Sequence, residues 1–185
     1  MMTFALLAGG RSTRMGQDKA SLPVGHHTLL THVAALGLAA GLRVVVCGRL
    51  APPDWSLPEV LFLPDAQPGE GPLRGLEAAL ALGDEVLLTA CDTPCLRLEA
   101  ITWICAQSAA EHGVATVIDG QLQPLFSRYT AACRTLVEKE FSVGRRSPLT
   151  VLKSGVFASA TPPEAIAAQL VDADTPADWQ RLGCS

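Results

Sequence analysis

Charged residues are scarce in this chain of 185 residues. Asp, Glu, Lys and Arg together make up 17% of it, whereas hydrophobic residues make up 49%, and the mean hydropathy is +0.29. A disordered chain has the opposite balance, rich in charge and poor in apolar side chains. The composition therefore excludes disorder and indicates a well-packed globular protein, with a length that suits one domain with a substantial core.

The chain also lacks an excess of positive charge. Its formal net charge of −4 argues against nucleic acid as the main partner, because proteins that bind the phosphate backbone carry a basic face. No apolar run approaches the roughly 18–20 residues of a membrane-spanning helix. The first residues lack the basic region, apolar segment and cleavage site of a signal peptide. We therefore expect a cytoplasmic protein that binds neither nucleic acid nor membranes.

Zinc and disulfide motifs are missing as well. The six cysteines are scattered without Cys-x-x-Cys spacing, and the four histidines form no ligand pattern. Such spacing gives little support to a zinc site or a disulfide framework. The simpler interpretation is that the cysteines are small buried hydrophobic residues in a reducing compartment.

Apolar runs and helical patterns alternate along the first half of the chain. Short apolar runs predict strands at residues 2–7, 43–47, 60–63, 85–90, 114–118 and 169–171. Helical spacing predicts helices at residues 29–42, 73–82, 98–110, 130–141 and 149–154, and a terminal helix with Thr175 as N-cap, Pro176 at N1 and Asp178 at N3. This alternation favours an α/β fold, a three-layer αβα sandwich around a mostly parallel, Rossmann-like sheet. Ligands of such sheets bind at the carboxyl ends of the strands, near a topological switch point.

Paired glycines follow the first predicted strand and open a long loop. Loops of this length in a compact domain are typical of binding loops. Gly9 and Gly10 allow backbone N–H groups to approach an anion closely. Beyond them, Arg11, Arg14 and Lys19 add three positive charges, as a polyphosphate requires. The stretch matches neither a P-loop nor a Gly-x-Gly-x-x-Gly fingerprint. The alternative to a phosphate-binding loop is an ordinary glycine turn with solvated basic residues.

Asp92 is the strongest candidate for a functional carboxylate, because it follows the predicted strand at residues 85–90 and precedes Thr-Pro. A carboxylate there can hold Mg²⁺, which proteins usually bind through one or two carboxylates plus substrate phosphates. The alternative is that Asp92 only caps the next helix. Asp172 and Asp174 form a second acidic pair before another Thr-Pro. They would either complete the metal's ligands or serve as helix-entry residues.

Residues 6–19 read Leu-Leu-Ala-Gly-Gly-Arg-Ser-Thr-Arg-Met-Gly-Gln-Asp-Lys, and this stretch resembles the signature of the molybdenum cofactor guanylyltransferase family. The resemblance extends to about Leu182. It implies a fold of the nucleotide-diphospho-sugar transferase type in one domain, residues 1–185, with a nucleotide-binding half (about 1–95) and an acceptor-binding half (about 96–185). It also implies transfer of GMP from GTP to molybdopterin, release of pyrophosphate, Mg²⁺ as cofactor, and transient contacts with other proteins of molybdenum cofactor biosynthesis or with acceptor proteins.

The same resemblance assigns roles to individual residues. It implies that Arg14 and Lys19 stabilise charge on the triphosphate, and that Asp92, in a Cys-Asp-Thr-Pro segment, holds the metal. The nucleotide-binding residues that it implies are Leu7, Ala8, Gly9, Gly10, Lys19, Asp65, Gly71, Pro72, Leu73 and Asp92. Those for the acceptor are Gln123, Pro124, Arg145 and Arg146, the last two in a Gly-Arg-Arg-Ser loop. Asp172 and Asp174 are secondary candidates for the metal.

Three positions depart from the family pattern. Arg74 replaces a small residue in the Gly-Pro-Leu-x-Gly loop, Cys47 stands where some relatives have asparagine, and asparagine is frequent at the position of Asp174. The alternatives to guanylyl transfer are a cytidylyltransferase on the same pterin, a nucleotidyltransferase that acts on a sugar phosphate, and a nucleotide-binding protein without catalysis. The first two would share the first loop and Asp92, and would differ in the base loop and the acceptor half.

Overall fold

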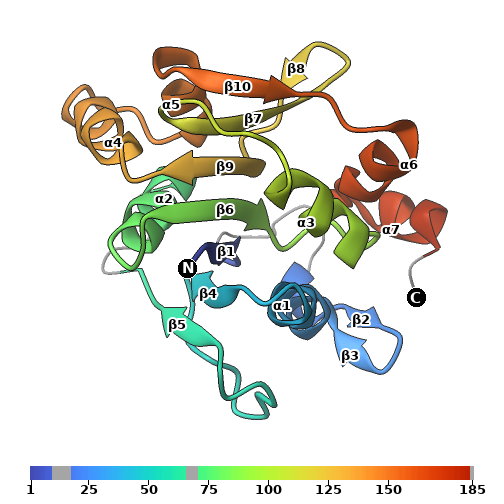
Figure 1. Cartoon of the computed structure of the whole chain (residues 1–185). Coiled ribbons are helices and arrows are strands. Elements are labelled where there is room, and N and C mark those ends of the chain that lie inside the picture. Colours follow the sequence, from blue (N-terminus) through green and yellow to red (C-terminus); the bar gives the residue numbers. More distant parts are fainter. Residues whose placement is uncertain (10–17, 66–70, 184–185) are drawn as a thin grey trace.

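Five strands form the central sheet of the computed structural model, which describes residues 1–9, 18–65 and 71–183 (Figure 1). They are β1 (Thr3–Leu7), β4 (Arg43–Cys47), β5 (Leu61–Leu63), β6 (Glu85–Ala90) and β9 (Phe126–Thr130). Their spatial order is β5-β4-β1-β6-β9, and all pairs are parallel except β6 with β9. The direction of chain progression reverses at β1, so the switch point lies between β1 and β6, where ligands of such sheets bind.

Smaller strands complete the β structure. A three-stranded sheet, β10-β7-β8, consists of β10 (Phe157–Ala160), β7 (Gly113–Ile118) and β8 (Gln121–Leu122). Figure 1 shows β7 beside β9, and the Thr130 N–H donates to the His112 carbonyl there, at 3.0 Å. A short hairpin pairs β2 (Pro23–Val24) with β3 (His27–Thr28). The strands after residue 96 thus add two antiparallel pairs, β6–β9 and β7–β8, and one parallel pair, β10–β7.

Helices cover both faces of the central sheet (Figure 1). They are α1 (Leu29–Ala39), α2 (Pro72–Leu80), α3 (Leu98–Cys105), α4 (Cys133–Ser142), α5 (Pro148–Ser154), α6 (Glu164–Ala167) and α7 (Pro176–Leu182), with 3₁₀ turns η1 (Lys19–Ser21) and η2 (Ala168–Leu170). Phe4 and Leu6 pack in one core with α1 and α3, and Ala5 packs in the other with α2, α4 and α5. Burial on both faces explains the continuous apolar strands, and the predicted three-layer αβα fold is confirmed.

Several predicted elements were wrong in place or kind. Residues 169–171 are not a strand, because most of that run lies in η2; the edge of the small sheet is instead β10, whose Ala-Ser-Ala sequence lacks the β-branched residues that mark a strand. Helix α3 ends at Cys105 rather than at 110, and the Arg128 guanidinium donates to the carbonyls of the residues at its end. In the described part of the chain, no helix is long and apolar enough to cross a membrane.

Among the residues that the structure describes, four cysteines are free, and Cys47, Cys91 and Cys133 of these are buried, as predicted. Burial raises the pKa of the Cys133 thiol to about 12, so this thiol stays neutral. Cys95 departs from the expectation because it is disulfide-bonded. The scattered spacing of the cysteines carried no signal for this bond.

Candidate nucleotide-binding and catalytic site

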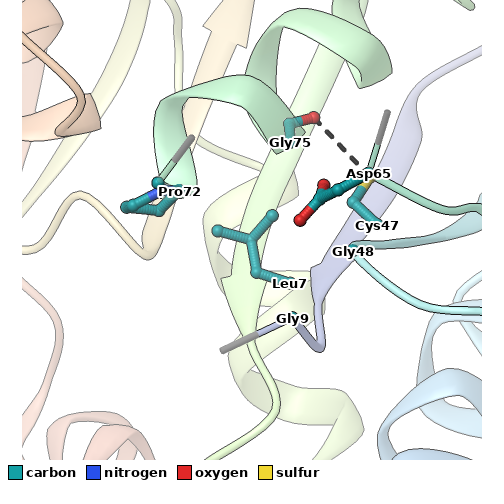
Figure 2. Close-up of a pocket in the computed structure, with 8 residues that line it drawn as sticks. Leu7, Gly9, Cys47, Gly48, Asp65, Pro72 and Gly75 are labelled. Carbon is teal, nitrogen blue, oxygen red and sulfur yellow. Dashed lines mark hydrogen bonds between the residues drawn. The ribbon is translucent and has the colours of Figure 1, made fainter. Parts of the chain in front are cut away.

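A pocket of about 210 Å³ lies at the carboxyl ends of β1, β4 and β5, against the first turns of α2 (Figure 2). It is lined by Leu7, Gly9, Cys47, Gly48, Asp65, Gly71, Pro72 and Gly75. Figure 2 shows the Asp65 carboxylate directed into the pocket, between Leu7 and Gly75. Five of the residues that the resemblance assigned to the nucleotide therefore surround one cavity, although they come from three separate parts of the chain.

Two glycines let the ends of β1 and β4 meet. The Ala8 N–H donates to the Cys47 carbonyl at 3.0 Å, and the Gly48 N–H donates to the Leu63 carbonyl at 2.9 Å, so the strand pairing continues into the loops. Gly48 has φ +94°, and a Cβ on it would lie 2.7 Å from the Cα of Gly9. Only glycine combines this backbone conformation with so close an approach. Gly48 was not among the predicted site residues, and its position directly after a predicted strand was the available signal.

We expect Gly48→Ala to lower the free energy of unfolding by about 2–4 kcal/mol, because a left-handed φ and a backbone overlap add together. Gly41→Ala is the matched control. Gly41 also has a positive φ, +73°, but a Cβ there would meet nothing within 4 Å among the described residues. Its loss should stay near about 1 kcal/mol. Urea denaturation of both variants measures the difference, and equal losses would mean that the approach to Gly9 contributes nothing.

The side of the pocket formed by α2 also depends on a glycine. A Cβ on Gly75 would overlap with the Leu7 side chain, so glycine lets the helix lie directly on β1. The Cys47 thiol donates to the Gly75 carbonyl at 3.6 Å. Burial, and to a smaller extent the Asp65 carboxylate, raises the pKa of the Cys47 thiol to about 12. The thiol hydrogen of Cys47 therefore bonds to the backbone of α2. Cys47 shapes the pocket as a small neutral side chain.

A second cluster lies near the ends of β1 and β6, where Lys19 faces two acidic segments. The Ala173 N–H donates to the Asp92 carbonyl at 2.8 Å, which brings residues 172–174 beside Asp92. The Lys19 Nζ lies 2.7 Å from the Asp174 Oδ1 and 3.9 Å from the Asp92 Oδ2. The structure thus brings together a cation and carboxylates that are more than seventy residues apart in the chain. Arg14 and Gly10, which belong to the same predicted loop, lie outside the described residues.

Asp92 has the environment of a carboxylate suited to a cation. Burial, with a smaller contribution from Asp174, raises its pKa, while Lys19 lowers it. Its Oδ1 is buried and accepts no hydrogen bond from the part of the chain that the structure describes. Within residues 1–9, 18–65 and 71–183, no group of three or more His, Cys, Asp or Glu side chains could hold a metal ion. Asp92 therefore suits the mode in which one or two carboxylates share the ion with substrate phosphates.

Asp172 is the most strongly perturbed of these carboxyl groups. Burial, then Asp92 and Asp174, raises its pKa from 3.8 to about 6. The folded protein thus binds more protons than the unfolded chain between these two values, and this group's contribution to stability falls as the pH rises through that window.

We expect Asp172→Asn to raise the Tm of the metal-free protein at about pH 7 and to leave it unchanged at about pH 4, where the carboxyl is protonated in the folded state. Residue 172 as a whole is exposed, although its carboxyl group lies partly buried near Asp92, so screening by solvent limits the gain to about 1 kcal/mol or less. Thermal unfolding in EDTA measures it, with the exposed Asp54→Asn as control. A gain that persists at the lower pH would rule out the charge as its cause.

Asp18 and Arg49 hold Lys19 in place, and neither was among the predicted site residues. Asp18 is the N-cap of η1: its Oδ1 accepts from the Ala20 N–H at 3.1 Å. Its Oδ2 pairs with the Arg49 guanidinium at 2.9 Å. Because Arg49 follows Gly48 after β4, this ion pair joins the start of the Lys19 segment to the edge of the pocket. A single arginine in a loop gave no signal in the sequence.

The four residues assigned to the acceptor lie in two places. Gln123 and Pro124 occupy the turn before β9, where their carbonyls accept from the Ser127 and Tyr129 hydroxyls at 2.6 and 2.8 Å. Arg145 and Arg146 lie between α4 and α5. The Arg146 carbonyl accepts from the Leu73 N–H at 3.1 Å. Arg146 is thus in contact with the first turn of α2, next to the pocket.

The doubly wound sheet carries the pocket with Asp65 at the ends of β1, β4 and β5, and the cluster of Lys19 with carboxylates near its switch point. This arrangement is that of an α/β nucleotide-binding protein. Residues 4–173 match the model of the MobA-like NTP transferase domain, and the chain belongs to this family. It is therefore a nucleotidyltransferase, and the family suggests a requirement for a divalent metal.

Individual relatives agree with this assignment. A probable molybdenum cofactor guanylyltransferase of Carboxydothermus hydrogenoformans is 32% identical over 192 residues, which cover 98% of this chain and 94% of the relative. Among solved structures, molybdopterin-guanine dinucleotide biosynthesis protein A of Archaeoglobus fulgidus has a TM-score of 0.76 at 19% identity, covering 98% of this chain and 96% of that one. The 2-C-methyl-D-erythritol 4-phosphate cytidylyltransferase of Thermus thermophilus has a TM-score of 0.62 at 18% identity, with 96% and 95% covered. These likenesses confirm the predicted fold type, which guanine- and cytosine-using enzymes share.

Proposed function

We propose that this chain transfers GMP from GTP to molybdopterin and releases pyrophosphate, forming the guanine dinucleotide cofactor. One observation carries the proposal: the acidic pocket and the Lys19–Asp92 cluster lie along one edge of the sheet, with the Gly9–Gly48 contact beside them. The ends of β5 and β6 are three strand spacings apart, about 15 Å. That span suits a nucleotide whose base lies near Asp65 and whose phosphates lie near Lys19. The names of the relatives support guanine and molybdopterin.

In the proposed reaction, the terminal phosphate of molybdopterin attacks the α-phosphorus of GTP. A P–O bond forms there, and the bond from the α-phosphorus to the oxygen bridging to the β-phosphorus breaks, so that pyrophosphate leaves with the electron pair. Such a step depends on positioning and charge neutralisation. Lys19 supplies a fixed cation for the triphosphate, and Arg14 is proposed to supply another. Gly9 and Gly10 are proposed to offer backbone N–H groups to the phosphates. Ala8, whose own N–H donates to the Cys47 carbonyl, is proposed to line the nucleotide site beside them.

We propose Mg²⁺ as the divalent metal. The buried Oδ1 of Asp92, which accepts no hydrogen bond from the described residues, fits such an ion, and Asp174 and Asp172 are secondary candidates. Bound there, the ion would neutralise charge on phosphate oxygens. Asp174 pairs with Lys19 at 2.7 Å, so it would have to exchange this partner to bind the metal.

Asp65 is proposed to select guanine. A carboxylate only accepts hydrogen bonds, and guanine presents two adjacent donors, N1–H and the 2-amino group. Adenine and cytosine have an unprotonated ring nitrogen in the matching position. Gly71, Pro72, Leu73 and Leu7 would form the apolar and backbone walls around the base.

We expect Asp65→Asn to raise the KM for GTP about tenfold to a hundredfold, in keeping with about 1–3 kcal/mol for a bidentate base contact. Turnover with CTP and ATP should change much less, so the selectivity for GTP falls. Steady-state kinetics with each nucleotide measures this, and the exposed Asp54→Asn is the control. Equal losses for all three nucleotides would assign Asp65 to the ribose or to structure instead.

The proposal extends to the whole chain. Residues 1–185 would form a single domain, whose two halves bind the nucleotide (about 1–95) and the acceptor (about 96–185), the latter through Gln123, Pro124, Arg145 and Arg146. We propose that the enzyme works in the cytoplasm and meets other proteins of molybdenum cofactor biosynthesis, or proteins that receive the product, only transiently.

The direct test is pyrophosphate release from GTP, ATP and CTP with Mg²⁺, with and without molybdopterin. Release that requires both GTP and the pterin would establish the proposed function. A preference for CTP with the same acceptor would assign the chain to the sister activity. Binding of GTP without any release would indicate a nucleotide-binding protein that does not catalyse transfer.

A further inference from the structure

Two arginines from separate segments meet on one aromatic ring. The Arg74 Cζ lies 4.4 Å from the centroid of the Phe141 ring, and the Arg146 Cζ lies 5.0 Å from it. Both distances fall within the range of cation–π contacts. Arg74 belongs to α2, which forms one side of the pocket, whereas Arg146 belongs to the basic loop assigned to the acceptor. We call these three residues the Arg–Phe junction.

The backbone joins the same two segments. Gly71, the N-cap of α2, has no side chain to satisfy the first N–H groups of the helix, and the Leu73 N–H donates to the Arg146 carbonyl instead, at 3.1 Å. A Cβ on Gly71 would lie 2.9 Å from the Arg146 Cβ. The basic loop therefore caps the helix whose first residues, Gly71 and Pro72, line the pocket.

The other side of the loop is fixed to the end of α4. The Arg145 guanidinium pairs at 3.1 Å with the Glu140 carboxylate, whose side chain is 2% exposed. Arg145 lowers the pKa of that carboxyl, in addition to a larger effect of the Thr150 hydroxyl. The Arg146 guanidinium donates to the Phe141 carbonyl at 3.3 Å. Through these contacts the loop, α4 and α2 form one connected unit.

We propose that the Arg–Phe junction couples nucleotide binding in the pocket to the conformation of the basic loop, so that GTP prepares the loop for the acceptor. A base that presses on Gly71 and Pro72 moves the first turn of α2, and the Arg146 carbonyl moves with it. Phe141 and Arg74 act as positioning residues in this scheme, because they contact the two segments rather than the reacting atoms. By linkage, the acceptor then raises the affinity for GTP by the same factor. The inference rests on the proposed function.

Hydrogen exchange of the full-length protein tests the coupling without the acceptor. We expect GTP with Mg²⁺ to slow amide exchange in residues 141–147 about fivefold or more, the lower end of typical coupling. Phe141→Leu should abolish this protection and leave the Kd for GTP within about twofold, while Phe141→Tyr, which keeps a ring, should retain it. Phe157→Leu is the matched control, because Phe157 packs on the same core as Phe141. If Phe141→Leu unfolds the protein, Arg74→Ala offers a second way to disrupt the junction, because it removes one of the two arginines from the Phe141 ring.

Kinetics then separates a positioning role from a structural one. At saturating GTP, Phe141→Leu and Arg74→Ala should raise the KM for molybdopterin about fivefold to tenfold with a smaller change in kcat. GTP binding without protection of residues 141–147, or protection that survives in both variants, would overturn the coupling and leave the proposed function intact. Failure of the wild-type protein to bind GTP would overturn both.

Discussion

Replacing Lys19 with alanine is expected to lower kcat/KM for GTP about a hundredfold to a thousandfold, the usual effect of removing one fixed charge from a phosphate or oxyanion site. The Lys19 side chain is 15% exposed, so bulk water screens its charge only in part. Its position between Asp92 and Asp174 is set by the Asp18 cap of η1, and a mobile cation could not replace a charge held in this way. Single-turnover release of pyrophosphate measures the loss.

The controls separate charge from fold. Lys153→Ala removes an exposed lysine from α5 and should leave turnover unchanged. Lys19→Arg keeps the charge and should recover part of the activity, although its planar head has a different geometry. Circular dichroism should show both Lys19 variants folded. Unchanged turnover in Lys19→Ala would remove this residue from the mechanism, whatever the fold or the family.

Much of the sheet could be predicted from the sequence, because strands buried on both faces appear as continuous apolar runs. The strands at 43–47 and 85–90 have the predicted limits. The cap of the terminal helix is also confirmed: the Thr175 side chain accepts from the Asp178 N–H, and Asp178 accepts from the Thr175 N–H. Local signals of this kind need only a few consecutive residues. The β10 strand gave no such signal, since its small residues pack against β7 without a β-branched pattern.

The site was predictable only where a motif existed. Asp65 and Asp92 follow apolar strands, and their positions at strand ends, together with the resemblance, marked them as candidates. Gly48 and Arg49 belong to the same site through contacts across the sheet, with Gly9 and with Asp18. Such contacts depend on strand order, which a single sequence does not state. The departure at Arg74 likewise gains a meaning only when Phe141 is placed beside it.

Asp92→Asn should change activity and stability in opposite directions. We expect turnover to fall about a thousandfold, since an amide is a poor ligand for a divalent ion and leaves the phosphate charge uncompensated. The amide side chain of this variant carries no charge. Burial has raised the pKa of the native carboxyl, which means that ionisation of Asp92 destabilises the folded protein at neutral pH. The Tm of the metal-free variant should therefore equal or exceed that of the wild type.

Ligands should affect the stability of the two proteins differently. Mg²⁺ with a non-hydrolysable GTP analogue should raise the Tm of the wild-type protein and have little effect on the variant, because binding stabilises only the state that holds the ligand. Differential scanning calorimetry with EDTA, and then with Mg²⁺ and nucleotide, measures both halves of the prediction. A lower Tm in EDTA would make Asp92 a structural helix-entry residue, the alternative that its Thr-Pro context allows. A higher Tm, together with lost turnover and lost stabilisation by ligand, would show that the Asp92 carboxylate lowers the stability of the folded protein and is needed to bind the metal.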